Sequence, residues 1–133
     1  NEDYSFEGRR ILLAEDNDLN AEIAMTILAG AGMEVDRAAD GIQCIDMLEK
    51  AEPGYYDLIL MDIQMPNMDG YKATMLIRKL DDKRLADIPI IAMTANAFNE
   101  DRKKAFEAGM NGHISNPISA ADLKMTLAGI MEE

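Results

Sequence analysis

Three acidic residues follow two apolar runs of the sequence, and carboxylates are groups that can bind divalent cations. Glu15 and Asp16 come directly after residues 11–14, and Asp62 comes directly after residues 58–61. Each run is short, continuous and apolar, which predicts a buried strand, so the acids mark the ends of two strands. Carboxylates that lie close together repel one another, and Mg²⁺ relieves that repulsion while accepting oxygen ligands. The alternative is that these acids only cap the helices that follow their strands.

A hydroxyl group follows a third apolar run. Thr94 comes directly after residues 90–93, which also predict a buried strand. A hydroxyl at that position can donate a hydrogen bond to an anionic oxygen. Threonine is also an ordinary residue at the end of a strand, because its β-branched side chain suits a pleated surface. The functional interpretation is favoured because the acids follow other strands of the same kind.

The elements that must position these side chains alternate along the chain. Strands are predicted at residues 11–14, 34–38, 58–61, 90–93 and 112–115. Four of the stretches between and after them carry apolar residues three or four positions apart, and another carries a looser apolar set, which together predict five helices. These residues are Leu19, Ile23 and Ile27; Ile42, Ile45 and Leu48; Ala73, Ile77 and Leu80; Phe98, Ala105 and Phe106; and Leu123, Leu127 and Ile130. The alternation predicts one α/β domain with a doubly wound parallel sheet.

The order of the strands decides whether the acids meet. Ligand sites of doubly wound sheets lie beyond the carboxyl ends of the strands, where the strand order reverses. In the order 2-1-3-4-5 the first and third strands are neighbours, so that Glu15, Asp16 and Asp62 would converge. We therefore expect a cation site at this edge of the sheet.

Composition narrows the classes of protein to consider. The chain has 133 residues, of which 48% are hydrophobic and 29% charged, as expected for one globular domain. Its net charge of −12 disfavours a long contact with nucleic acid or an anionic membrane surface, and no apolar run approaches the ~18 residues of a membrane span. The single Cys44 cannot form an internal disulfide, which favours a reducing, cytoplasmic location. Because the chain begins at Asn1, we expect a fragment of a longer protein.

Three segments resemble a known family. They read ILLAEDN at residues 11–17, LILMDIQMPNMDG at residues 58–70 and PIIAMTANA at residues 89–97. In type, order and spacing they are similar to the motifs of response regulator receiver domains in two-component signalling, above all those of hybrid sensor histidine kinases. The resemblance covers residues 9–131 and leaves residues 1–8 as an N-terminal arm or linker remnant. It implies a flavodoxin-like fold, which the alternation of strands and helices predicts independently.

The resemblance implies a role for each site residue. Asp62 matches the aspartate that attacks a phosphohistidine and becomes an aspartyl phosphate, in a transfer and a later hydrolysis that such domains catalyse themselves. Glu15 and Asp16 match the metal-binding acids, which hold Mg²⁺ together with Asp62 and the backbone carbonyl of Gln64. Thr94 matches the switch hydroxyl that bonds a phosphoryl oxygen. The implied partner is a histidine kinase or a histidine phosphotransfer domain, and a weak homodimer is a further option.

Two positions depart from the family pattern. Asn116 precedes Pro117 where receiver domains carry a lysine, and its amide brings no charge to pair with a phosphoryl group. We therefore expect phosphorylation to couple less strongly to the output surface. His113 stands where many members have an aromatic residue that turns inward on activation, so it is either that switch or an ordinary half-exposed strand residue.

Two alternative functions stay open. The missing charge at Asn116 allows a degenerate receiver that binds a protein partner without phosphate chemistry. An aspartate nucleophile after a strand also occurs in phosphohydrolases, but those enzymes carry a second aspartate two positions later as general acid. That position here is Gln64, which is no general acid, so we expect no such enzyme.

Overall fold

The centre of the molecule is a parallel sheet of five strands. The computed structural model describes residues 7–94, 99–115 and 118–131. The strands are β1 (Arg10–Ala14), β2 (Glu34–Ala38), β3 (Leu58–Asp62), β4 (Ile90–Thr94) and β5 (Gly112–Ser115). They pair in the order β2-β1-β3-β4-β5, and every pair is parallel. The predicted flavodoxin-like strand order is therefore confirmed.

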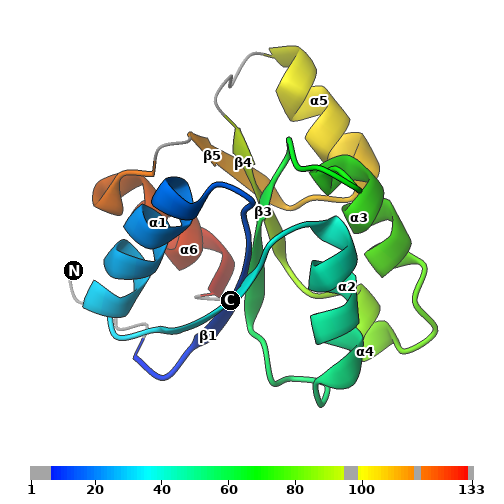
Figure 1. Cartoon of the computed structure of the whole chain (residues 1–133), viewed down its shortest axis with the longest axis horizontal. Coiled ribbons are helices and arrows are strands. Elements are labelled where there is room, and N and C mark those ends of the chain that lie inside the picture. Colours follow the sequence, from blue (N-terminus) through cyan, green and yellow to red (C-terminus); the bar gives the residue numbers. More distant parts are fainter. Residues whose placement is uncertain (1–6, 95–98, 116–117, 132–133) are drawn as a thin grey trace.

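Six helices of the described chain lie between and after the strands, and helices cover both faces of the sheet (Figure 1). They are α1 (Asp18–Gly30), α2 (Gly41–Lys50), α3 (Gly70–Arg78), α4 (Lys83–Ala86), α5 (Asn99–Ala108) and α6 (Ala120–Met131). Helices α1 and α6 pack on one face of the sheet, and α2, α3 and α5 pack on the other. In the residues that the structure describes, none of these helices is both long and apolar enough to cross a membrane.

Both faces of the sheet are buried, as a doubly wound sheet requires. Ile11 and Leu13 of β1 pack with α1 and α6 in one apolar layer. Leu12 and Ala14, which point the other way, pack with α2 and α3 in a second layer. All residues of β3 and β4 are buried, which explains why these strands read as continuous apolar runs. Burying each large apolar side chain stabilises the fold by about 1.5–3 kcal/mol, so this core fixes the strand register firmly.

The structure contains one helix more than the five predicted. The additional helix, α4, is a single turn between α3 and β4. It begins after Asp82, whose side chain accepts a hydrogen bond from the backbone N–H of Arg84 at 2.9 Å. Four residues are too few for a helical period to be visible in a sequence, and the predicted number was wrong for that reason.

Two helices bury other residues than their large apolar side chains suggested. The predicted face of α1 begins at Leu19, which is 65% exposed. The helix instead buries Ala21, Ala24 and Leu28. In α5, Phe106 is 79% exposed, and the helix packs through Ala105 and Ala108. Phe98, another residue of that predicted face, lies outside the described part of the chain. Small residues let both helices approach the sheet closely, and a pattern of large apolar residues misses them.

Arg78 joins several elements at one end of the sheet. Its guanidinium donates hydrogen bonds to the backbone carbonyls of Ala86 and Ile88, each at 2.6 Å. It also donates to the carbonyl of Gly109 at 2.9 Å and to Asn111 Oδ1 at 2.8 Å. These bonds connect the end of α3 with the segment before β4 and with the segment that follows α5. The C-terminal end of α5 is thereby fixed to the body of the domain.

Candidate metal and active site

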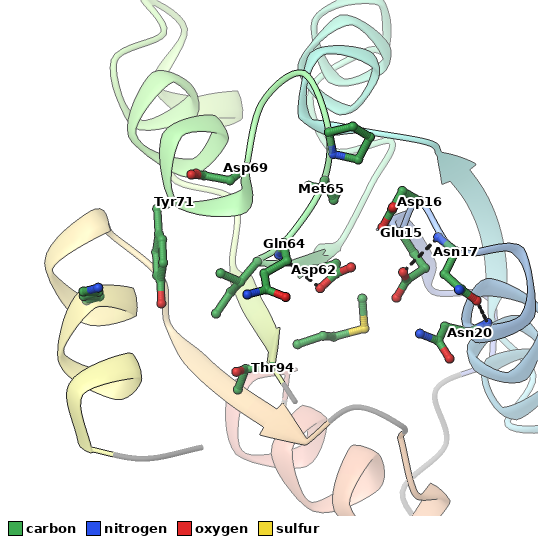
Figure 2. Close-up of a pocket in the computed structure, with 14 residues that line it drawn as sticks. Glu15, Asp16, Asn17, Asn20, Asp62, Gln64, Met65, Asp69, Tyr71 and Thr94 are labelled. Carbon is green, nitrogen blue, oxygen red and sulfur yellow. Dashed lines mark hydrogen bonds between the residues drawn. The ribbon is translucent and has the colours of Figure 1, made fainter. Parts of the chain in front are cut away.

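The three predicted acids meet in space. Glu15, Asp16 and Asp62 each offer a carboxylate oxygen, and these oxygens all lie within 4.8 Å of one another. Figure 2 shows the three side chains gathered in one part of a pocket, although they come from segments that are far apart in the sequence. The predicted convergence is confirmed.

The register of the sheet explains this convergence. β1 pairs with β3 so that Ala14 lies opposite Met61. The next residues, Glu15 and Asp62, therefore reach the edge of the sheet side by side. The backbone N–H of Glu15 still bonds to β2 at 3.0 Å, and its side chain is buried. Asp16 lies one residue further along and is exposed, so the acid cluster runs from the interior to the surface.

Other residues cap the neighbouring helices. Helix α1 is capped by Asn17, whose side chain accepts a hydrogen bond from the backbone N–H of Asn20 at 2.9 Å. Helix α3 is capped by Asp69, whose side chain accepts one from the backbone N–H of Lys72 at 2.8 Å. The alternative that Asp16 serves as a cap is therefore wrong. Asp69 has the structural role that a carboxylate before a helix commonly has.

The crowding of the acids changes the acidity of Asp62. Burial is the largest cause, followed by a hydrogen bond to Glu15 and by charge repulsion from Glu15 and, more weakly, Asp16. Together they raise the pKa of Asp62 from 3.8 to about 8, although the backbone N–H of Gln64 acts in the opposite direction. Three ionised carboxylates are therefore costly here at neutral pH. A divalent cation would remove that cost, and a donor set made of oxygens fits Mg²⁺.

A tight turn after β3 holds Asp62 in place. Gly70, the first residue of α3, lies so close to the backbone carbonyl of Asp62 that a Cβ at this position would overlap it. The backbone N–H of Gly70 donates to the carbonyl of Ile63 at 2.8 Å. Asn67 adopts a left-handed φ of 68° and donates to the carboxylate of Asp40 at 2.7 Å. The turn is thus tied to both α3 and the start of α2.

The acids open into a pocket of about 830 Å³ beyond the carboxyl ends of β1, β3 and β4. Gln64 and Thr94, two other residues predicted for the site, also line this pocket. Figure 2 places Gln64 and Thr94 on the side of Asp62 that faces away from Asp16. A group bound to Asp62 would therefore have acids on one side and hydrogen-bonding side chains on the other.

His113 lies apart from the residues that line the pocket. It is half-buried in β5, and its Nε2 accepts a hydrogen bond from Arg102 Nε at 3.0 Å. Burial, and then the positive charge of Arg102, lower the pKa of His113 below its ordinary 6.5, so the ring is neutral at pH 7. Asn116, the other residue singled out near β5, lies outside the described part of the chain.

Three further residues line the pocket that no sequence motif marked: Asn20, Tyr71 and Lys104. Tyr71 lies in the first turn of α3, and Lys104 lies in α5 beside the buried Ala105. The one feature of the sequence that could have indicated Lys104 as a pocket residue is its position next to Ala105, a small residue that packs on the sheet. That feature becomes informative only when the packed face of α5 is known.

Comparison with known proteins gives one family. The profile of the response regulator receiver domain matches residues 11–128. Hybrid signal transduction histidine kinase L of Dictyostelium discoideum is 40% identical over 116 residues, which are 86% of this chain and 7% of that protein. Histidine protein kinase 1 of Candida albicans is 42% identical over 130 residues, which are 92% of this chain and 5% of that protein. The chain thus spans less than a tenth of the length of these relatives.

A solved structure extends the comparison to three dimensions. The receiver domain of a sensor histidine kinase from Pseudomonas aeruginosa has a TM-score of 0.83 against this chain and is 40% identical to it. The match covers 95% of this chain and 99% of that one. The structure of that protein has a magnesium ion coordinated in its active site cleft.

Proposed function

Because this chain belongs to the family of response regulator receiver domains of two-component signalling, we propose that Asp62 accepts a phosphoryl group from a phosphohistidine. The donor is a histidine kinase or a histidine phosphotransfer domain. One observation carries the proposal: the carboxylate oxygens of Glu15, Asp16 and Asp62 lie within 4.8 Å of one another in an open pocket.

Once Asp62 has lost the proton that its raised pKa of about 8 retains at neutral pH, it needs no general base for this reaction. Its ionised carboxylate oxygen attacks phosphorus in line with the leaving nitrogen. The N–P bond breaks as the O–P bond forms, and the histidine ring leaves with the bonding electrons, as a neutral imidazole when its other nitrogen is protonated. The product is an aspartyl phosphate, a mixed anhydride that water later hydrolyses to the carboxylate and free phosphate.

The donor set supports a site for Mg²⁺. Glu15, Asp16 and Asp62 supply carboxylate oxygens, and we assign the backbone carbonyl of Gln64 as a further donor. When bound, Mg²⁺ supplies positive charge that neutralises the carboxylates and the oxygens of the transferring phosphoryl group. The raised pKa of Asp62 supports this assignment, because these carboxylates repel one another in the absence of such a charge.

Thr94 and His113 are the residues that we assign to signalling. The hydroxyl of Thr94, which lines the pocket, would donate to a phosphoryl oxygen. His113 would transmit to β5 the conformational change that follows phosphorylation, because its bond to Arg102 joins β5 to α5. Asn116 occupies the position of the usual family lysine and carries no charge. We therefore expect weaker coupling between phosphorylation and the output surface.

We place this reaction in the cytoplasm, within a longer protein of the hybrid histidine kinase type. The similarity to hybrid histidine kinases supports the second part of this proposal. The buried, free Cys44 agrees with a reducing compartment. The net charge of −12 continues to disfavour nucleic acid as a partner of this domain.

Labelling with a small phosphodonor tests the proposal. Acetyl phosphate should add one phosphoryl group to the wild type when Mg²⁺ is present and none when it is chelated, as read by intact mass. Asp62→Asn should abolish the addition. Asp46→Asn, which removes an exposed acid of α2, should leave it unchanged. Labelling that persists in Asp62→Asn would place the acceptor elsewhere and contradict the proposal. A folded wild type that takes no label would favour the phosphate-independent binding module instead.

A further inference from the structure

The proposed phosphoryl site needs more positive charge than a divalent cation brings. A phosphoryl group carries about −1.5 to −2 charges at neutral pH. The pocket already contains the carboxylates of Glu15, Asp16 and Asp69. Negative charge on phosphoryl oxygens is stabilised by a positive side chain that can reach them. Residue 116 is an asparagine and cannot provide that charge.

Lys104 brings positive charge to this pocket. Among the described residues that line it, Lys104 is the only one with a basic side chain. It is exposed, and its neighbour Ala105 packs α5 onto the sheet. Figure 2 shows α5 beside Tyr71, on the side of the pocket opposite Glu15. The ammonium has three donors on a flexible stem, so it can turn toward an anion in the pocket that it lines.

The other two basic residues of α5 are placed differently. Arg102 bonds to His113 at 3.0 Å, on the side of β5. Lys103 is exposed and lies apart from the residues that line the pocket. Successive residues of a helix are turned by about 100°, so three consecutive cations point in three directions. Of these three, Lys104 is the one on the side of the pocket.

We propose that the ammonium of Lys104 pairs with a phosphoryl oxygen during transfer to Asp62 and in the resulting aspartyl phosphate. This inference rests on the proposed function of Asp62. With acetyl phosphate as donor, an O–P bond forms to Asp62, the O–P bond of the donor breaks, and acetate leaves with the bonding electrons. No proton is exchanged in this step, and Lys104 stays protonated while it stabilises the phosphoryl oxygens.

Matched variants of two adjacent lysines test the inference. Wild type, Lys104→Gln, Lys104→Arg and Lys103→Gln are labelled with acetyl phosphate at saturating Mg²⁺, and the initial rate is read by intact mass. We expect Lys104→Gln to slow labelling about 10-fold, less than the loss of a buried oxyanion donor, because Lys104 is exposed. Lys104→Arg should restore most of the rate, and Lys103→Gln should match the wild type.

A second measurement separates a charge effect from structural damage. Affinity for Mg²⁺ is measured on the same unphosphorylated variants by titration calorimetry. We expect Lys104→Gln to bind Mg²⁺ at least as tightly as the wild type, because it removes a cation from an acidic pocket. Weaker binding of Mg²⁺ in this variant would indicate a distorted site and contradict the inference.

The outcomes for Lys104 and Asp62 are distinguishable. Equal labelling rates in Lys104→Gln and Lys103→Gln would overturn the role of Lys104, while a label that is lost in Asp62→Asn would leave the proposed function intact. A loss of rate that Lys104→Arg does not restore would contradict a role for the positive charge. A wild type that takes no label would overturn both.

Discussion

The side chains of Glu15 and Asp62 hydrogen-bond to each other, although each belongs to the end of a different strand. Such a bond between two carboxyl groups needs a proton on one of them. Because the pKa of Asp62 is raised to about 8, Asp62 carries that proton at neutral pH. A cation must therefore compete with the proton on Asp62 for the same oxygens.

Without Mg²⁺, the free energy of unfolding should fall as the pH rises from about 4 to about 8. The ordinary pKa of Asp62 is 3.8, and its folded value is about 8. Between these values the folded chain keeps a proton that the unfolded chain releases, so rising pH favours unfolding. Because water reaches the pocket, we expect a loss of about 1–3 kcal/mol rather than the full equivalent of the shift.

Urea unfolding of the wild type and Asp62→Asn, in the presence of a chelator, measures this loss. Asp62→Asn should remove most of it and should be the more stable protein near the upper end of the range. Other titrating groups contribute equally to both proteins, so the difference isolates Asp62. Identical pH slopes for the two proteins would show that Asp62 has no raised pKa.

Mg²⁺ should bind more tightly as the pH rises through the pKa of Asp62. Binding requires Asp62 to be ionised, so it releases the proton of Asp62 below about pH 8. At 100 times its dissociation constant, Mg²⁺ should stabilise the fold by about 2.7 kcal/mol. Titration calorimetry at several pH values, in two buffers of different ionisation enthalpy, measures both the affinity and the proton release.

Variants of two nearby acids test where Mg²⁺ binds. Asp16→Asn should weaken that binding, because Asp16 belongs to the cluster. Asp18→Asn is the matched control, because Asp18 is exposed at the start of α1 and pairs with Arg37 instead. Affinity that does not change with pH, or that falls equally in the two variants, would be inconsistent with the cluster as the binding site.

Arg78→Ala should lower the free energy of unfolding by about 3 kcal/mol, because it removes the donor to three partly buried backbone carbonyls. Arg84→Ala is the control, since Arg84 is exposed and bonds to the side chain of Asp82. Arg78→Lys should recover only part of the loss, because one ammonium cannot reproduce the fork of a guanidinium. Urea unfolding compares the three variants, and equal stabilities for the two alanine variants would refute a structural role for Arg78.

Gly70→Ala should destabilise the fold by about 1–3 kcal/mol and slow the labelling of Asp62. The added Cβ meets the backbone carbonyl of Asp62, so either α3 or the site residue must move. Gly129→Ala is the matched control, because a Cβ there enters open space on α6. That change should stabilise the helix by about 0.5–1 kcal/mol. Thermal unfolding and labelling of both variants check the prediction, and no difference between them would argue against a close approach at Gly70.

The sequence predicts the sheet and the acid cluster well because both depend on strong local signals. A strand buried on both faces must be apolar throughout, and residues 58–61 and 90–93 satisfy this. Once the runs alternate with helices, few topologies remain, and the commonest ones bring the ends of neighbouring strands together. Glu15 and Asp62 can therefore be assigned to one site from the sequence alone.

The features that the sequence does not predict depend on packing between elements. The buried face of α1 contains the small Ala21 and Ala24 beside Leu28, while Leu19 stays exposed, so a pattern of large apolar residues alone selects the wrong face. Lys104 is one of three consecutive basic residues, and its place next to Ala105 distinguishes it from Lys103 only when the packed face of α5 is known. Only the rotation of α5 about its axis, set by Ala105 and Ala108 against the rest of the domain, decides which cation reaches the pocket.

The bonds of Arg78 also determine how α5 can move. They hold the carbonyl of Gly109, so the C-terminal end of the helix would be the fixed point, or fulcrum, of any tilt of α5. A helix rises about 1.5 Å per residue, which puts Lys104 nearer to this fulcrum than Arg102. A tilt of α5 that moves Lys104 would therefore move Arg102 further, and the bond between Arg102 and His113 would pass that motion to β5.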